Sequence, residues 1–323
     1  DKSVLAEGKW VKVRVKTSGV KCITKTALAK MGFSDMSSIS VYGNGGYVLP
    51  RKVMDFRYDD LTQLPVHRTD DGIFFYAQDG KQWSYLMSTH LYAKCKLNEY
   101  DPYTYYYITD SKEPSPAPSV YSKLQPIDRT VDYYDARVHH ELYSENILRS
   151  GRDWVGEKIL GEKPSKTISL SLPIRNDNDT VFFECRVIGR SGSDMSYALY
   201  YNDEEFYTDE FASVNTSSTV EYYGRSMYVK KIIVASDKKR NDFKITFKPN
   251  STSDCIWLDY VTVSSRTNAD MTGKDEMFVR TIDSYYNPNK NAELVTESDS
   301  SIQYVVNGAE ASYIVWKISD YLA

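Results

Sequence analysis

The residues of this chain that are best suited to nucleophilic or metal chemistry are its four cysteines and four histidines. They are Cys22, Cys95, Cys185, Cys255, His67, His90, His139 and His140. A catalytic thiol needs a neighbouring imidazole, or a glycine-rich turn into a helix N-terminus, to favour the thiolate. Nothing in the sequence beside any of these cysteines indicates such activation. We therefore predict no catalytic residue within this chain.

The cysteine spacing is informative in a second way. The four thiols lie far apart and form no C-x-x-C pair, which argues against a zinc site or a redox pair. Cys185 and Cys255 fall inside strand-like patterns, where a free cysteine behaves as a small buried hydrophobe. The spacing alone leaves open whether any of the cysteines form disulfides.

The run His139-His140-Glu141 places two imidazoles beside a carboxylate. It lacks the histidines at i and i+4 of the H-E-x-x-H zinc motif, and its surroundings do not predict a long helix. We predict an exposed polar strand here, with no metal and no cofactor. A self-contained enzyme that uses these three residues is kept as one functional hypothesis.

Other polar groups are predicted to be structural. Asp177-Asn178-Asp179 resembles part of a calcium loop but lacks the glycine and the distant glutamate of that motif. Gly43-Asn44-Gly45-Gly46 is not followed by the Lys-Ser/Thr of a phosphate-binding loop, and a turn is predicted. The carboxylate pairs Asp59-Asp60 and Glu204-Glu205 are expected to be solvated.

Composition excludes several classes of protein. Among 323 residues, 40 Lys and Arg face 44 Asp and Glu, and the formal net charge of -4 gives no excess for binding nucleic acid. No apolar run approaches the roughly 18 residues that would span a bilayer. No apolar surface patch is evident in the sequence, so we expect a monomer. The start at Asp1, without a methionine or a signal-like segment, is expected for an exported chain whose signal has been removed.

The elements that must position these residues are mainly strands. The 28 tyrosines, together with threonine and valine, favour half-buried pleated surfaces. In residues 10–15 the valines alternate with Trp10, Lys12 and Arg14, which predicts a half-solvated strand. A short helix is predicted near 26–31, with Thr24 or Thr26 as its N-cap and Gly32 just beyond its C-terminus.

We predict an all-β fold with one or two short helices, in two domains. Residues 1–160 are expected to form a mixed, β-rich N-terminal domain. Residues 161–323 are expected to form a two-sheet β-sandwich or jelly roll, because short alternating segments recur there at regular spacing. The predicted strands of that second domain cover residues 168–174, 181–187, 197–201, 220–223, 228–235, 243–247, 255–263, 277–280, 302–306 and 313–318.

Several segments share a pattern with one family. They are residues 9–13, 17–24, 31–33, 41–46, 71–78, 105–109, 150–157, 257–261 and 315–320. The most specific is 150–157, Ser-Gly-Arg-Asp-Trp-Val-Gly-Glu, and 257–261 reads Trp-Leu-Asp-Tyr-Val. Together they resemble the gingipain-type cysteine peptidases of Bacteroidetes, and among these the type IX secretion sortases. Cys22 stands where that family usually has tyrosine, and Lys317 where it has aspartate.

The resemblance implies an N-terminal region without chemistry of its own. In that family the peptidase domain, with its His and Cys dyad, follows the segment similar to residues 315–320. The parent protein is then expected to be an exported cysteine endopeptidase or sortase that removes C-terminal secretion signals from cargo at the cell surface. The expected partners are the downstream peptidase domain and secretion-system or cell-surface proteins.

An alternative function comes from the tyrosine content alone. A tyrosine-rich sandwich with exposed rings is suited to stacking on sugars or on peptides. On this hypothesis the chain is a stand-alone carbohydrate- or peptide-binding surface protein. Many of the tyrosines alternate within predicted strands, however, and are also explained as ordinary sheet residues.

Overall fold

The structure, a computed structural model, describes residues 2–50, 52–85, 93–120, 127, 129–151, 153–173, 180–217, 223–234, 240–280, 302–310 and 312–318. The chain divides into two compact units. The first unit comprises Asp1–Gln82, Lys96–Leu124 and Glu310–Ala323, and the second comprises Trp83–Cys95 and Gln125–Ala309. The predicted domain boundary after residue 160 falls inside the second unit.

The first unit contains two antiparallel sheets. One has the strand order β1 (Val11–Val15), β9 (Thr104–Asp110), β3 (Ile39–Tyr42), β4 (Gln63–Leu64). The other has the order β2 (Gly19–Thr24), β6 (Gly72–Ala77), β5 (His67–Arg68). Two 3-10 turns, η1 (Val4–Ala6) and η2 (Met36–Ser38), accompany them. Their core contains the fully buried side chains of Leu28, Ile39, Phe75, Tyr106 and Ile108.

The helix α1 (Lys25–Lys30) confirms the predicted short helix and decides between its two candidate caps. The hydroxyl oxygen of Thr24 accepts a 3.2 Å hydrogen bond from the amide of Ala27, so Thr24 is the N-cap. Gly32 adopts φ +84°, the left-handed conformation that ends a helix at low cost in glycine. The amide of Phe33 then donates to the carbonyl of Leu28 at 2.9 Å.

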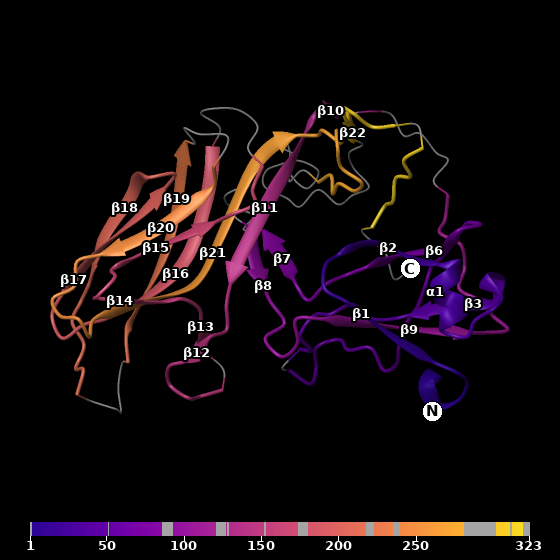
Figure 1. Ribbon diagram of the computed structural model, residues 1–323, viewed down its shortest axis with the longest axis horizontal. Coiled ribbons are helices and arrows are strands. Elements are labelled where there is room, and N and C mark those ends of the chain that lie inside the picture. The colour runs from indigo at the N-terminus through magenta and orange to yellow at the C-terminus, as the bar shows by residue number, and fades with distance from the viewer. Residues whose placement is uncertain are drawn as a thin grey trace. The chain divides into compact units, whose positions relative to one another are not determined.

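The second unit is built on a two-sheet sandwich. One sheet has the order β11 (Tyr133–Glu141), β21 (Cys255–Asn268), β16 (Thr180–Arg190), β19 (Arg225–Val234), with β14 (Lys158–Leu160) also paired to β21. The other has the order β15 (Ser165–Ser169), β20 (Asp242–Phe247), β17 (Met195–Tyr201), β18 (Glu204–Phe211). Figure 1 shows β11, β21 and β16 lying side by side.

The core of the sandwich lies between these sheets. Alternate residues of β16, namely Val181, Phe183, Cys185 and Val187, point into it, and Phe183 stacks on Phe243 of the opposite sheet at 6.4 Å. Because strand residues alternate between faces, the intervening residues of β16 point to the other side of the same sheet. We call that side the outer face. The all-β fold and the two-sheet sandwich predicted from the sequence are therefore confirmed.

Three short strand pairs complete the described structure. They are β7 (Gln82–Tyr85) with β8 (Ala93–Lys96), β12 (Glu145–Asn146) with β13 (Trp154–Val155), and the parallel pair β10 (Arg129–Val131) with β22 (Ile302–Tyr304). Within the ranges that the structure describes, no helix has the length and apolar character needed to cross a membrane.

Three strand predictions are wrong in whole or in part. Residues 277–280 and 313–318 lie outside strands, although their composition favours one. The strand predicted at 168–174 ends at Ser169 in β15, and the described residues 170–173 lie outside it. A short apolar segment becomes a strand where a neighbour pairs with it, and the segment itself does not encode that neighbour. The predicted strand at 220–223 falls mostly outside the described residues.

Candidate functional site

A β-bulge in β21 creates the most unusual feature of the outer face. Arg186 of β16 lies opposite Tyr260, but the next residue, Val187, lies opposite Leu258. Asp259 is therefore an extra residue with no direct partner in β16. Since the alternation shifts at the bulge, Asp259 and Tyr260 both lie on the outer face while Leu258 points into the core.

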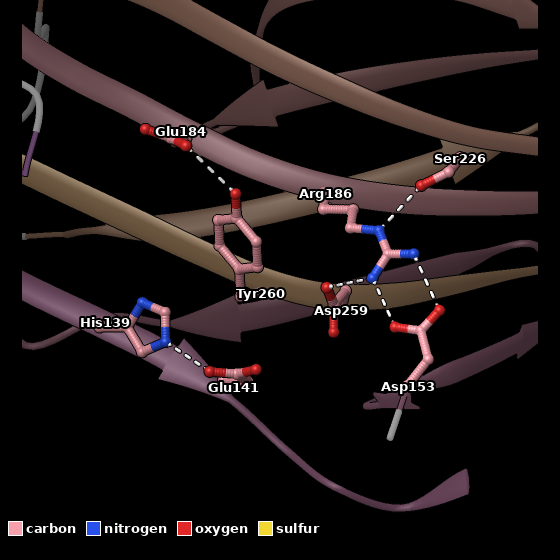
Figure 2. Close-up of polar contacts among 8 residues, drawn as sticks. All are labelled: His139, Glu141, Asp153, Glu184, Arg186, Ser226, Asp259 and Tyr260. Atoms are coloured by element: carbon pink, nitrogen blue, oxygen red, sulfur yellow. Dashed lines mark hydrogen bonds and ion pairs between the residues drawn. The ribbon is translucent and has the colours of Figure 1, made fainter. Parts of the chain in front are cut away.

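Strand register then gathers polar side chains from four strands on this face. One cross-strand row joins Glu141, Tyr260, Arg186 and Tyr228, and the next joins His139, Thr262, Glu184 and Lys230. We refer to His139, Glu141, Asp153, Glu184, Arg186, Asp259 and Tyr260 as the outer-face cluster (Figure 2).

Arg186 is the centre of this cluster and its guanidinium is closely bound. Nη1 and Nη2 donate to the two carboxylate oxygens of Asp153 at 2.8 and 3.1 Å, a bidentate pair. Nη1 also donates to Asp259 at 3.0 Å, and Nε donates to the hydroxyl of Ser226 at 2.8 Å. Tyr228 lies under the guanidinium at 5.6 Å. Arg186 thus links β21, β19 and the segment around Asp153.

The pKa values of the two carboxylates that bind Arg186 are shifted in opposite directions. Burial raises the pKa of Asp259 to about 6, and the charge of Arg186 offsets only part of that rise. Hydrogen bonds from Arg186 lower the pKa of the more exposed Asp153. Burial alone would lower the pKa of Arg186, but the hydrogen bonds and charges of its partners outweigh burial and raise it. The guanidinium therefore stays charged at any physiological pH.

His139 and Glu141 form a couple, as the sequence pattern allowed. The Nε2 of His139 lies 2.9 Å from a Glu141 carboxylate oxygen, and Nδ1 lies 2.7 Å from the hydroxyl of Thr262. Because an ionised carboxylate accepts only, Nε2 donates to Glu141, and in the neutral ring Nδ1 accepts from Thr262. Figure 2 shows the His139–Glu141 contact beside Tyr260.

This hydroxyl–imidazole–carboxylate arrangement is closed to substrates. The side chain of His139 is 1% exposed and Thr262 is 3% exposed. Trp83 of β7 packs edge-on against the imidazole at 6.2 Å, and Tyr260 lies on it at 5.7 Å. The prediction of an exposed strand is wrong for His139, because the ring is covered by aromatic side chains.

His140 lies on the opposite face of β11 and does not join this couple. Its Nε2 contacts Glu157 at 2.6 Å. Burial would favour the protonated form of Glu157, but the hydrogen bond and charge of His140 outweigh it and lower the pKa of Glu157. The three residues grouped by the sequence hypothesis, His139, His140 and Glu141, therefore act in two separate pairs.

Three of the four cysteines lie in environments that do not activate a thiol. Cys185 is buried in the sandwich core, and burial raises its pKa to about 12. Cys255 is buried beside Trp257, and burial raises its pKa to about 11. Partial burial also raises the pKa of the exposed Cys22 in β2. These shifts disfavour the nucleophilic thiolate at all three positions.

Cys95 and the remaining histidines are placed as follows. Cys95 lies in β8, partly exposed. His67 lies in β5, where Phe74 and Trp316 pack around its ring at 6.2 and 6.3 Å. His90 lies outside the described residues, as does the proposed turn at 177–179. Within the described ranges, no group of three or more His, Cys, Asp or Glu side chains is arranged to hold a metal ion.

Asp60 illustrates the structural use of a carboxylate pair. It accepts hydrogen bonds from the amides of Val4 and Leu61 at 2.6 and 2.8 Å, and from the hydroxyl of Ser3 at 3.1 Å. These bonds lower its pKa and tie the N-terminal segment down. The sequence predicted a solvated carboxylate at position 60. In the structure this carboxylate also holds residues 3 and 4 in place through hydrogen bonds.

Two of the sequence motifs meet at the outer-face cluster. Asp153 and Gly156 belong to the segment 150–157, and Leu258 and Asp259 to 257–261. The amide of Gly156 donates to the carbonyl of Leu258 at 2.9 Å. A Cβ at position 156 would stand 2.8 Å from that same carbonyl oxygen, so glycine permits the close approach. This approach brings Asp153 next to Arg186.

A small hollow opens beside the cluster. Its volume is about 260 Å³, and it is lined by Cys95, Glu184, Tyr228, Lys230 and Tyr260. Glu184 is 5% exposed, and the hydroxyl of Tyr260 donates to its Oε1 at 3.2 Å. Among the described residues, its other oxygen, Oε2, has no hydrogen-bond partner. Lys230 Nζ lies 3.9 Å from Oε2, an ion pair beyond hydrogen-bond distance.

Sequence reasoning missed Arg186 and Glu184 as site residues. Both lie in β16, between residues that are strongly apolar. Charged residues that alternate with apolar ones are normally predicted to face solvent, so neither was expected to belong to a site. One signal was available: Phe182 to Ile188 places Glu184 and Arg186 on the same face of a long strand. Their partners come from residues 33 to 76 positions away, which sequence patterns do not reveal.

The comparisons with known proteins agree with an all-β protein related to the family indicated by the motifs. The chain is similar in structure to the dimeric latent form of PorU from Porphyromonas gingivalis, with a TM-score of 0.72 and 26% sequence identity. The similarity covers 87% of this chain and 26% of the PorU chain, so this chain spans about a quarter of that protein. This likeness supports a relationship to the gingipain-like, type IX sortase-related proteins.

Two further structural similarities are too weak to carry an argument. A CBM36 domain of a multidomain xylanase from the hindgut metagenome of Trinervitermes trinervoides has 13% identity and a TM-score of 0.23, over 41% of this chain and 95% of that one. Eiger TNF from S. frugiperda has 8% identity and a TM-score of 0.25, over 46% and 100%. No protein-family model matches the chain, and no curated protein has a similar sequence.

Proposed function

We propose that this chain is the non-catalytic N-terminal region of a gingipain-like cysteine endopeptidase or type IX secretion sortase. Its partner would be a peptidase domain of the same polypeptide, which it supports or shields. The parent protein would be exported and act at the cell surface or outside the cell. The observation that carries this proposal is the similarity to PorU over 87% of this chain but only 26% of PorU.

The environments of the thiols support the non-catalytic part of the proposal. A cysteine peptidase needs a thiolate beside an imidazole that substrate can reach. Cys185 and Cys255 are buried and have raised pKa values. The imidazole of His139, which contacts both Thr262 and Glu141, is buried as well. The bidentate Arg186–Asp153 pair adds rigidity, because several strands are joined through one side chain.

A proteolysis assay tests the proposal that this chain has no cysteine-peptidase activity of its own. The purified chain is incubated with casein and with fluorogenic peptides under reducing conditions, with papain as the positive control. We expect no turnover that responds to alkylation by iodoacetamide. Turnover that disappears on alkylation and in one of the four single Cys→Ala variants would contradict the proposal.

The gene tests the place of this region in a longer protein. We expect the reading frame to continue past the codon for Ala323 into a domain that carries a histidine and a cysteine as a catalytic dyad. A stop codon directly after position 323 would be incompatible with the proposed role.

The monomeric state predicted for the isolated chain is measured by light scattering after size-exclusion chromatography.

A further inference from the structure

The hollow beside the outer-face cluster contains an unused hydrogen-bond acceptor. Glu184 is only 5% exposed, yet its Oε2 has no hydrogen-bond donor among the described residues. A buried carboxylate oxygen without a donor is costly, since burial removes the water that would otherwise bind it. Figure 2 shows the Tyr260 hydroxyl directed at Glu184, where it satisfies Oε1 and leaves Oε2 available.

The charges around the hollow select against charged ligands. Lys230 lies 3.9 Å from the free oxygen of Glu184, so the two side chains neutralise each other. An added ammonium group would be repelled by Lys230, and an added carboxylate or phosphate would be repelled by Glu184. Arg186 is occupied by Asp153 and Asp259 and does not contribute a free positive charge. The hollow therefore favours an uncharged ligand that both donates and accepts hydrogen bonds.

The tyrosine rings that line the hollow indicate which class of uncharged ligand would fit. Tyr228 lines the hollow and is 64% exposed, so its ring offers surface for stacking beside the polar pair. A flat apolar ring next to a carboxylate acceptor and an ammonium donor matches a sugar, which has apolar C–H faces and hydroxyl edges. The volume of about 260 Å³ is just below the usual range for ligand pockets, so the hollow has room for no more than a single sugar ring.

A peptide backbone fits this geometry less well. Extended peptides are recognised by adding to a sheet edge, where main-chain amides and carbonyls are exposed. Glu184 and Tyr260 belong to β16 and β21, which are central in the sheet, and the hollow opens on the face of the sheet.

We propose that this hollow binds a neutral sugar residue, with the ring stacked on Tyr228, one hydroxyl donating to Glu184 and a neighbouring hydroxyl accepting from Lys230. The binding would give the chain a ligand-recognition activity in addition to its proposed supporting role. It does not depend on that role, because the residues concerned lie within this chain.

A glycan array followed by isothermal titration calorimetry tests the proposal. The array presents neutral oligosaccharides built from glucose, galactose, mannose, xylose and N-acetylglucosamine, and the full chain is applied. We expect at least one neutral glycan to bind saturably, and its affinity to fall at least tenfold in the Tyr228→Ala variant. Because Tyr228 is mostly exposed, this variant should fold, which a circular dichroism melt checks.

Matched variants make the result specific. Tyr100→Ala removes a ring that is 76% exposed in the first unit, and binding should be unchanged. Glu184→Gln keeps the shape but weakens the acceptor, and the affinity should fall about fivefold or more. The proposal is overturned by an array without neutral hits, by glycan binding that survives Tyr228→Ala, or by a preference for extended peptides that compete at this site.

Discussion

Arg186 and Asp259 are joined across a β-bulge, with Nη1 of the arginine donating to the carboxylate at 3.0 Å. The bulge is what makes the contact available, since regular alternation would direct one of the residues 259 and 260 into the core. The pair places a second carboxylate beside a guanidinium that Asp153 already binds in bidentate fashion. Two carboxylates thus share one cation, and one of them is buried.

Ionisation of Asp259 should destabilise the folded chain as the pH rises. Its pKa is raised by burial from 3.8 to about 6, so the folded state holds a proton that the unfolded state has already lost. This stabilising contribution is complete below the unfolded pKa and is lost as the pH rises through about 6. In urea titrations, the stability of the wild type relative to Asp259→Asn should fall between about pH 4 and pH 7, by about 3 kcal/mol at most, at about 1.4 kcal/mol per pKa unit.

Asp153 provides the control with the opposite sign. Its pKa is lowered by hydrogen bonds from Arg186, so its contribution is present above the unfolded pKa and is lost as the pH falls through the lower, folded pKa. The stability of the wild type relative to Asp153→Asn should therefore decrease on acidification below about pH 4. Equal pH slopes for the two variants would contradict the assignment of the buried proton to Asp259.

Removing the N-cap of α1 should destabilise the first unit. The Thr24 hydroxyl accepts from the amide of Ala27, and this amide has no partner within the helix. Thr24→Ala should lower the free energy of unfolding by about 1 kcal/mol. The matched control is Thr26→Ala, at another exposed threonine, inside α1. This change should be neutral or slightly stabilising because alanine has the higher helix propensity.

Local patterns predicted much of the fold. Alternation in residues 10–15 identified β1, where Val15 is buried and Lys12 is exposed, and the threonine and glycine signals identified α1 within one residue. The same reasoning failed where a segment depends on partners distant in sequence. Residues 277–280 have the composition of a strand but are not paired as one.

The candidate site was less predictable than the fold. The sequence grouped His139, His140 and Glu141, yet strand alternation sends His140 to the opposite face. Arg186 was not singled out, because its importance comes from Asp153, 33 residues away, and from a bulge 73 residues away. A bulge shifts every later side chain by one position, and no composition signal marks where it occurs.

The thiols should react in the order of their exposure. At about pH 8, Ellman's reagent should modify Cys22, which is exposed, in the native chain. Cys185 should react at least about a hundredfold more slowly, because its reaction requires the sandwich to open. Peptide mass mapping after timed quenching identifies the modified sites, and labelling in urea serves as the control in which Cys185 becomes reactive. Rapid native labelling of Cys185 would show that the sandwich core is more open than described.

Adding a methyl group at Gly156 should disturb the arrangement that holds Asp153 against Arg186. The new Cβ would lie 2.8 Å from the carbonyl oxygen of Leu258, a backbone atom that cannot move away without displacing β21. Gly156→Ala should therefore lower the free energy of unfolding by about 1–3 kcal/mol, measured by urea denaturation. Gly192→Ala is the matched control, because its Cβ would meet only the Thr216 side chain at 3.7 Å, an ordinary contact. That change should be neutral or stabilising by up to about 1 kcal/mol, since alanine restricts the unfolded chain. If both variants lost the same stability, close approach at position 156 would not be what fixes the segment beside the bulge.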